Sequence, residues 1–92
     1  MKRDQAEAVA LQALGWLIGR DDRMAAFLSW SGAGPEALAA GARDPAFLGC
    51  VLDYVLQSDD QVIDFCDATG LPYGLPAQAR AALPGGDLPH WT

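Results

Sequence analysis

The fold is decided by the stretch DPAFLGCVLDYVLQSDDQVIDFCDATG, residues 44–70, because almost every residue in it has a recognisable role in a helix. Asp44 is a good N-cap, and Pro45 suits the first helical position, where its missing N–H costs nothing. Ser58 opens a second helix, and Gly70 closes it. The stretch therefore predicts two antiparallel helices joined by a tight corner.

Apolar residues give each of these two helices one buried face. In the first helix they recur at steps of one and four, and they are Phe47, Leu48, Val51, Leu52, Val55 and Leu56. This spacing leaves Gly49, Asp53 and Gln57 on the other side. In the second helix the expected apolar residues are Val62, Ile63, Phe65 and Cys66. Such a hairpin needs further helices to cover it.

The rest of the chain supplies four more helical patterns. They cover about residues 5–18, a short segment that restarts at Asp21 or Asp22 and stops at Gly32, residues 35–42, and residues 76–83. Asp4 with Glu7 resembles a capping box for the first of them. The segment from Pro35 has little except Leu38 and alanines to bury, so we expect it to cover an edge. The sequence predicts an all-α fold, a compact bundle of about six short helices, as one domain with a core at 4–83 and an irregular tail at 84–92.

Charge and targeting patterns exclude several classes of function. The 92 residues carry a net charge of −6 with a pI near 4.3, which disfavours nucleic acid and anionic membranes as partners. The first residues lack the apolar run of an export signal, so we expect a cytoplasmic protein. Cys50 and Cys66 fall in helices, where such cysteines more often behave as small buried hydrophobes than as a disulfide.

The chain also matches itself at a period of 38. Residues 8–32 laid on 46–70 without a gap pair Trp16 with Tyr54, Phe27 with Phe65, and Gly32 with Gly70, among others. One interpretation is a bundle of two pseudo-symmetric three-helix repeats. The alternative is that any two amphipathic hairpins with similar corners align this well.

Several segments together resemble the short alphaproteobacterial proteins grouped as domain-of-unknown-function family 3572. These segments are ALQALGWL, FLSWSG, ARDPAFLGCVLDYVL, FCDATGL and ARAALPGG, and they span nearly the whole chain. The resemblance implies an all-helical cytoplasmic protein and supplies no activity and no functional residue.

The sequence offers no credible catalytic, metal or cofactor site. His90, the sole histidine, lies in the tail, so a Ser-His-Asp or Cys-His pair would require the tail to fold back over a preformed nucleophile. One histidine and two separated cysteines cannot furnish a tetrahedral zinc site. The glycines form neither a dinucleotide-binding nor a Walker pattern. We therefore expect no enzyme activity and no cofactor.

Two kinds of side chain could instead meet a partner. Asp60, Asp64 and Asp67 follow steps of four and three, so they line one helix face, either as a solvated surface or as a contact for a cation or a basic partner. Trp30 lies off the centre of its apolar face, and Trp91 lies in the tail; both are either covered or presented to a partner. The leading hypothesis is a non-catalytic module that binds another cytoplasmic protein or itself. The alternative is a binder of a small apolar ligand between helices.

Truncation after Gly86 should separate the two interpretations of the tail, which contains Leu88, Pro89, His90 and Trp91. We expect the tail to dock on its own domain, because one buried indole contributes roughly 2–3 kcal/mol of transfer free energy to a small core. Truncation should then lower the melting temperature and shift the tryptophan emission. An unchanged melt with loss of a binding partner would instead make the tail a recognition motif.

Overall fold

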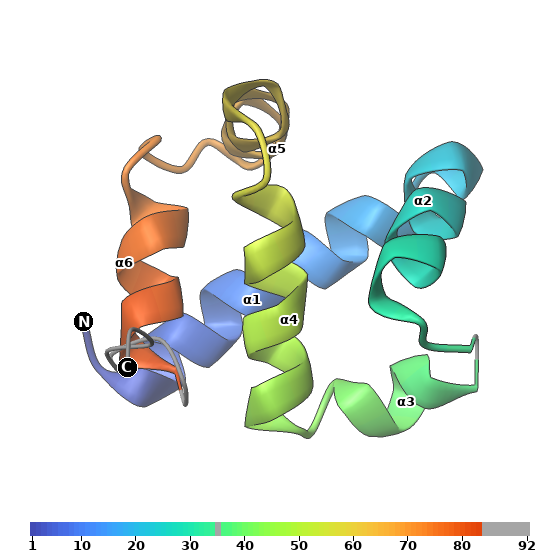
Figure 1. The fold of residues 1–92 in the computed structure, drawn as a ribbon. Helices are drawn as coiled ribbons and strands as arrows, with labels where there is room; N and C mark the ends of the chain where they lie inside the picture. The colour runs from blue at the N-terminus through green and yellow to red at the C-terminus, as the bar shows by residue number, and fades with distance from the viewer. Residues whose placement is uncertain (35, 84–92) are drawn as a thin grey trace, which may run out of the picture.

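The computed structural model describes residues 1–34 and 36–83, which form six α-helices and no β-strand (Figure 1). The helices are α1 (Arg3–Ile18), α2 (Asp21–Ser31), α3 (Ala37–Gly41), α4 (Pro45–Val55), α5 (Asp59–Thr69) and α6 (Leu75–Ala82). The all-α fold and the order of the six helices are confirmed. Within the described residues, no helix combines the length and the apolar character that crossing a bilayer requires. Pro35 and the tail at 84–92 lie outside the described residues.

Helices α1 and α4 form the centre of the bundle. They pack against each other, and α2, α5 and α6 each pack against both of them, while α3 packs on α4 (Figure 1). The core consists of the buried apolar residues of this arrangement: Ala6, Val9, Ala10, Ala13, Leu14, Leu17, Phe27, Leu48, Val51, Leu52, Val55, Phe65, Cys66, Ala79 and Leu83. Residues from α1, α2, α4, α5 and α6, together with Leu83 just after α6, thus share one continuous core.

The helix ends of α4 and α5 follow the expected capping chemistry, but the antiparallel arrangement predicted for these two helices is wrong, because α5 crosses α4 and does not run back along it (Figure 1). Asp44 Oδ1 accepts a hydrogen bond from the Ala46 N–H at 3.0 Å, and Ser58 Oγ accepts one from the Gln61 N–H at 3.2 Å. Gly70 ends α5 with a φ of 75°, a left-handed conformation that favours glycine. The local sequence therefore sets the corner between α4 and α5.

The capping box predicted at Asp4 and Glu7 is wrong. Helix α1 begins two residues earlier than predicted, at Arg3, and the Lys2 N–H donates to Gln5 Oε1 at 3.2 Å. Glu7 pairs with Arg3 at 3.3 Å on the surface instead. An ion pair one helical turn apart competes with the reciprocal cap for the same carboxylate.

Two positions on α4 and α5 face the opposite way from the prediction. Gly49 is buried, because α6 packs over it: a Cβ at this position would lie 3.0 Å from Arg80 Nη1. Ile63 is 40% exposed, because the side of α5 that faces the core is the one that carries Phe65 and Cys66. Ala79 on α6 is fully buried.

Helix α3 is shorter than predicted and covers an edge, as expected. Gly41 at its end is buried against the Phe47 ring, which a Cβ at this position would overlap. Leu38 is partly buried against the core. The close approach at Gly41 lets this five-residue helix pack against the start of α4.

The two proposed repeats share local features. Helices α2 and α5 are offset by the predicted period along their full length, and both end at a left-handed glycine. Phe27 and Phe65 are both fully buried. The third helix of each proposed repeat differs. Helix α3 has five residues, whereas α6 has eight and packs against both α1 and α4. A true duplication stays a prediction.

Replacement of Phe65 by alanine should cost about 3–5 kcal/mol of unfolding free energy, because the ring is fully buried and its removal leaves a cavity. Phe27→Ala should cost a similar amount. Ile63→Ala, on the same helix but exposed, should cost less than about 0.5 kcal/mol. Urea titrations followed by circular dichroism measure all three, and a loss under about 1 kcal/mol for Phe65→Ala would contradict its role as a core anchor.

Candidate interaction surface

Trp30 is a large aromatic side chain held at the surface by other aromatic rings. It lies in the last turn of α2 and keeps 44% of its surface exposed. Its ring centroid lies 5.4 Å from that of Tyr54 on α4 and 6.5 Å from that of Phe27. Phe27 also meets the Phe47 ring edge-on at 5.9 Å. We call these four residues the aromatic cluster; Phe27 is its buried base and Trp30 its outer edge.

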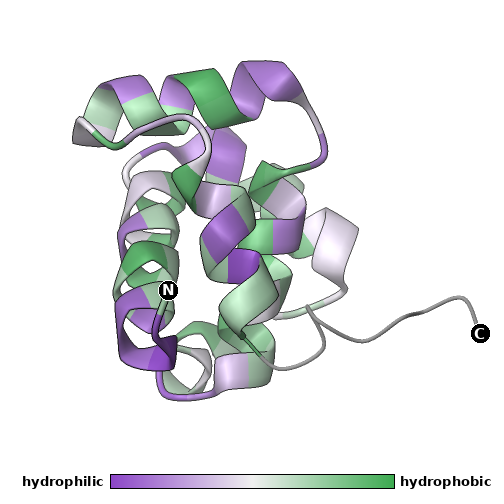
Figure 2. Ribbon diagram, turned by 90° about the vertical axis from the view of Figure 1, so that its left-hand side faces the viewer, coloured by the Kyte–Doolittle hydropathy of each residue, from purple (hydrophilic) through white to green (hydrophobic). Residues whose placement is uncertain are grey.

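The second exposed candidate, the acidic face of α5, is partly engaged within the chain. Asp60, Asp64 and Asp67 are all exposed, and Figure 2 shows hydrophilic and hydrophobic residues alternating along α5 at the top of the molecule. Asp67 Oδ1 accepts a hydrogen bond from the Tyr73 hydroxyl at 2.7 Å. Asp60 lies in the first turn, where its charge favours the helix dipole. Trp91, the fifth predicted surface residue, lies outside the described residues.

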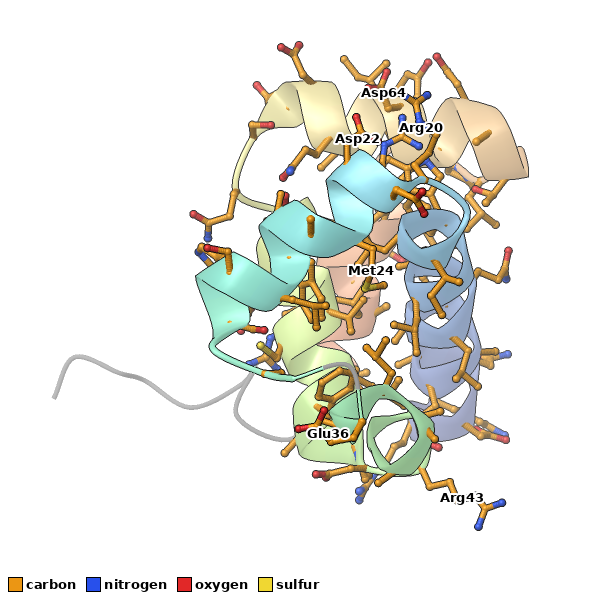
Figure 3. The ribbon with its side chains drawn as sticks, turned by 90° about the vertical axis from the view of Figure 1, so that its right-hand side faces the viewer. Arg20, Asp22, Met24, Glu36, Arg43 and Asp64 are labelled. Carbon is orange, nitrogen blue, oxygen red and sulfur yellow. The ribbon has the colours of Figure 1, made fainter. Side chains whose placement is uncertain are left out.

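Asp64 faces the start of α2. Its Oδ2 lies 4.0 Å from Arg23 Nη2, and Figure 3 shows it beside the end of α2 that carries Arg20 and Asp22. The Arg23 guanidinium also lies over the Trp16 ring, 4.1 Å from its centroid. Asp64 therefore helps to orient a cation that covers Trp16, so it has a structural reason to be acidic.

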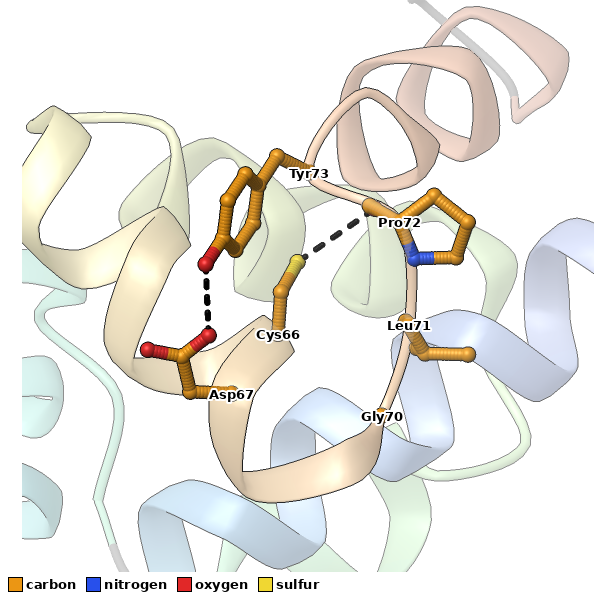
Figure 4. A pocket seen from close by; sticks show the side chains of 6 residues that line it. All are labelled: Cys66, Asp67, Gly70, Leu71, Pro72 and Tyr73. Atoms are coloured by element: carbon orange, nitrogen blue, oxygen red, sulfur yellow. Dashed lines mark hydrogen bonds between the residues drawn. The ribbon is translucent and has the colours of Figure 1, made fainter.

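The turn after α5 forms a shallow, open depression of about 290 Å³. Figure 4 shows its lining: Cys66, Asp67, Gly70, Leu71, Pro72 and Tyr73. The Cys66 thiol donates to the Pro72 carbonyl at 3.5 Å. Ligand pockets usually enclose about 300–1,000 Å³ and bury most of their ligand. An open depression of this size gives no support to the alternative of an apolar ligand.

Both cysteines are free thiols, and neither is activated. Burial raises the pKa of Cys66, with a further contribution from the nearby Asp67 carboxylate. Burial likewise raises the pKa of Cys50, with Asp53 adding to it. A raised thiol pKa disfavours the nucleophilic thiolate. Among the residues that the structure describes, no group of three or more His, Cys, Asp or Glu side chains could hold a metal ion.

Sequence reasoning missed the ion pair between α4 and α6. Arg80 Nε on α6 donates to Asp53 Oδ1 on α4 at 2.6 Å, and both side chains are partly buried. The pair connects α6 to the side of α4 opposite the predicted apolar face. The residues are far apart in the chain, and no local pattern links them. One signal in the sequence could have indicated this pair. Gly49 lies one helical turn before Asp53, and its missing side chain leaves space for Arg80.

These features define a small, acidic, all-α bundle with an exposed aromatic cluster. The chain belongs to the family of proteins of unknown function DUF3572, whose family model matches residues 3–86. This match confirms the resemblance in the sequence. No curated protein and no solved structure gave a significant match.

The bond between Tyr73 and Asp67 predicts a pH effect. The hydrogen bond to the Asp67 carboxylate raises the pKa of Tyr73. Because the folded pKa lies above the unfolded one, the bond stabilises the fold below the ordinary tyrosine pKa, and this contribution is lost as pH rises through the folded pKa. In a Tyr54→Phe background, Asp67→Asn should therefore lower the midpoint of the phenolate absorbance titration.

Asp60→Asn is the matched control, since this residue is exposed on the same helix and has no part in the bond. It should leave the midpoint of the Tyr73 titration in place. An equal shift for the two variants would mean that the general charge of α5, and not the hydrogen bond, raises the pKa.

Proposed function

We propose that this protein is a non-catalytic interaction module of the cytoplasm, and that it binds a basic segment of another protein through Trp30. The observation that carries the proposal is an indole left 44% exposed on top of other aromatic rings. Isolated exposed leucines or isoleucines are common on protein surfaces. Tryptophan is enriched among the residues that dominate the binding energy of interfaces.

The aromatic cluster prepares Trp30 for binding. The ring contact with Tyr54 and the contact with the buried Phe27 restrict the indole before any partner arrives. A side chain that is already ordered loses less entropy on association. The cluster therefore supports a contact surface better than a flexible exposed side chain would.

Charge indicates the chemistry of the partner. The chain carries a net charge of −6, which attracts basic segments and repels acidic ones. Tyr54, which supports Trp30, lies at the end of α4. The next helix, α5, begins with two acidic residues, Asp59 and Asp60. An arginine of the partner could stack on the Trp30 indole while a neighbouring cation meets these carboxylates. Both interactions favour a basic segment.

Further observations support the non-catalytic, cytoplasmic part of the proposal. The thiols have raised pKa values, the open depression is shallow, and the Asp67 carboxylate accepts a hydrogen bond from the Tyr73 hydroxyl. Two unpaired cysteines fit a reducing compartment. The acidic composition agrees with a partner that is a protein and not nucleic acid.

A photo-crosslinking amino acid in place of Trp30 tests this function in the native host. The expected result is one dominant adduct whose crosslinked peptide, identified by mass spectrometry, is rich in Arg or Lys. The yield should fall as salt is raised, because screening weakens the contact with Asp59 and Asp60.

The same crosslinker at Gln78 is the control, because this exposed residue lies on α6, at the opposite side of the bundle from α2 (Figure 1). It should not give that adduct. The proposal fails if positions 30 and 78 give the same adducts, or if the peptide crosslinked at position 30 is neutral or acidic.

A further inference from the structure

Helix α5 is attached to the rest of the bundle by few buried side chains. Phe65 and Cys66 are its buried residues, while Val62 and, in the turn after the helix, Leu71 are partly buried against the core. Figure 1 shows α5 lying across the end of α4. Most of the buried core lies on α1, α4 and α6, which pack against one another without α5. The core therefore does not need α5 in order to stay largely assembled.

Helix α2 also buries a single residue, but its attachment is stronger. Phe27 of α2 contacts two rings of α4, those of Phe47 and Tyr54. The ring contact of Phe65 on α5 is with Trp16 of α1, at 5.7 Å between centroids. Since packed aromatic pairs contribute to stability beyond the area that they bury, the additional ring contact favours α2. Of the two peripheral helices, α5 is the one that can separate more easily.

Charge gives α5 little further hold. Asp64 Oδ2 lies 4.0 Å from Arg23 Nη2 on α2, and the Asp64 side chain is 62% exposed. Such exposed ion pairs contribute little to stability. Asp59, Asp60 and Asp67 also lie on α5, which contains no basic residue, in a chain whose net charge is −6. Mutual repulsion in an acidic chain destabilises the compact state.

Two buried polar atoms reduce the net gain from closing α5 onto α1. Trp16 Nε1 and Gln61 Oε1 are buried without a hydrogen-bond partner among the described residues. Trp16 packs on Phe65, and Gln61 lies one turn before Phe65 on the same side of α5. A buried polar group without a partner carries a desolvation cost. Separation of α5 from α1 gives this region access to water, so it recovers part of that cost.

Helix α5 and the turn that follows it are connected to each other. The Cys66 thiol donates to the Pro72 carbonyl at 3.5 Å, and the Tyr73 hydroxyl donates to Asp67 Oδ1 at 2.7 Å (Figure 4). We call residues 58–73 the α5 unit. Both bonds lie within the unit, so movement of the whole unit does not break them.

We propose that the α5 unit is a lid over Trp16, which opens as one piece while α1, α4 and α6 stay folded. The backbone bends at Gln57 and Gly74, the residues that flank the lid, and the Trp16 and Phe65 rings separate. A free helix of eleven residues is marginal in water, so the lid loses its helical hydrogen bonds when it opens. The aromatic cluster lies on α2 and α4, so the opening does not depend on the proposed contact at Trp30.

Native-state hydrogen exchange of the full wild-type chain, measured by NMR at a series of low urea concentrations, tests the lid. The amides of Phe65 and Leu71 should share one opening equilibrium with a small urea dependence. The amides of Leu14 on α1 and Leu52 on α4 should exchange only through global unfolding, with the urea dependence of the whole chain. Their protection should exceed that of the lid by at least about tenfold.

Cys66 gives a second readout, because its thiol is buried in the lid. In a Cys50→Ala variant, a thiol reagent at low concentration should reach Cys66 through the open lid. The matched control is Val51→Cys in a chain whose two native cysteines are replaced by alanine, because Val51 is fully buried on α4. After correction for the rates in urea-unfolded chains, Cys66 should be labelled at least about tenfold faster than the thiol at position 51.

Leu48→Val, added to both labelling variants, distinguishes opening of the lid from unfolding of the whole chain. Leu48 is buried in the first turn of α4, at the end away from α5 (Figure 1). The substitution destabilises the closed and the open states equally, relative to the unfolded chain. Labelling at position 51 should therefore become faster, while Cys66 should keep its rate.

Two results would overturn the proposal. One is exchange of the α5 amides with the same free energy and urea dependence as the amides of α1 and α4. The other is a rise in the Cys66 labelling rate with Leu48→Val that equals the rise at position 51, because Cys66 would then be reached only in the unfolded chain.

Discussion

The structure depends on aromatic contacts between the two halves of the chain, α1–α3 and α4–α6. We call this reciprocal packing the exchange. Phe27 on α2 packs against Tyr54 on α4, with ring centroids 5.5 Å apart, and Phe65 on α5 packs against Trp16 on α1 at 5.7 Å. Each phenylalanine is fully buried, and each is covered by an aromatic residue from the other half. In a chain this short, two such pairs represent much of the available core. The halves therefore stabilise each other.

This exchange also places the surface features. Tyr54 covers Phe27 from α4, and in this position it also supports the indole of Trp30. On the other side, Trp16 covers Phe65 and receives the Arg23 guanidinium, which lies near Asp64. The same packing thus exposes an aromatic surface at one end of α2 and engages the acidic face of α5 at the other.

Much of the fold could be predicted from the sequence, because it is encoded locally. Capping residues such as Ser58 and terminal glycines such as Gly70 set helix ends through neighbouring backbone groups, and they do so largely independently of the tertiary arrangement. The burial of Phe27 and Phe65 followed from helical periodicity. Trp30 could be placed at the edge of its apolar face for the same reason.

What could not be predicted depends on contacts between distant segments. The position of α6 was missed because its small residues give a weak apolar pattern, although close packing against α1 and α4 buries them. The pair of Asp53 with Arg80 follows from that position. Similarly, Gly15 and Gly49 have the same local sequence signature, and only the three-dimensional structure shows that one is buried and the other is open.

Double-mutant cycles for the two aromatic pairs test the mutual stabilisation of the halves most directly. The variants are Phe27→Leu with Tyr54→Leu, and Phe65→Leu with Trp16→Leu, each measured singly and together by urea denaturation. The exchange predicts a coupling of about 0.5–1.5 kcal/mol within each pair. It predicts no coupling between Phe27 and Trp16, which belong to the same half. Additive effects within both aromatic pairs would contradict the account.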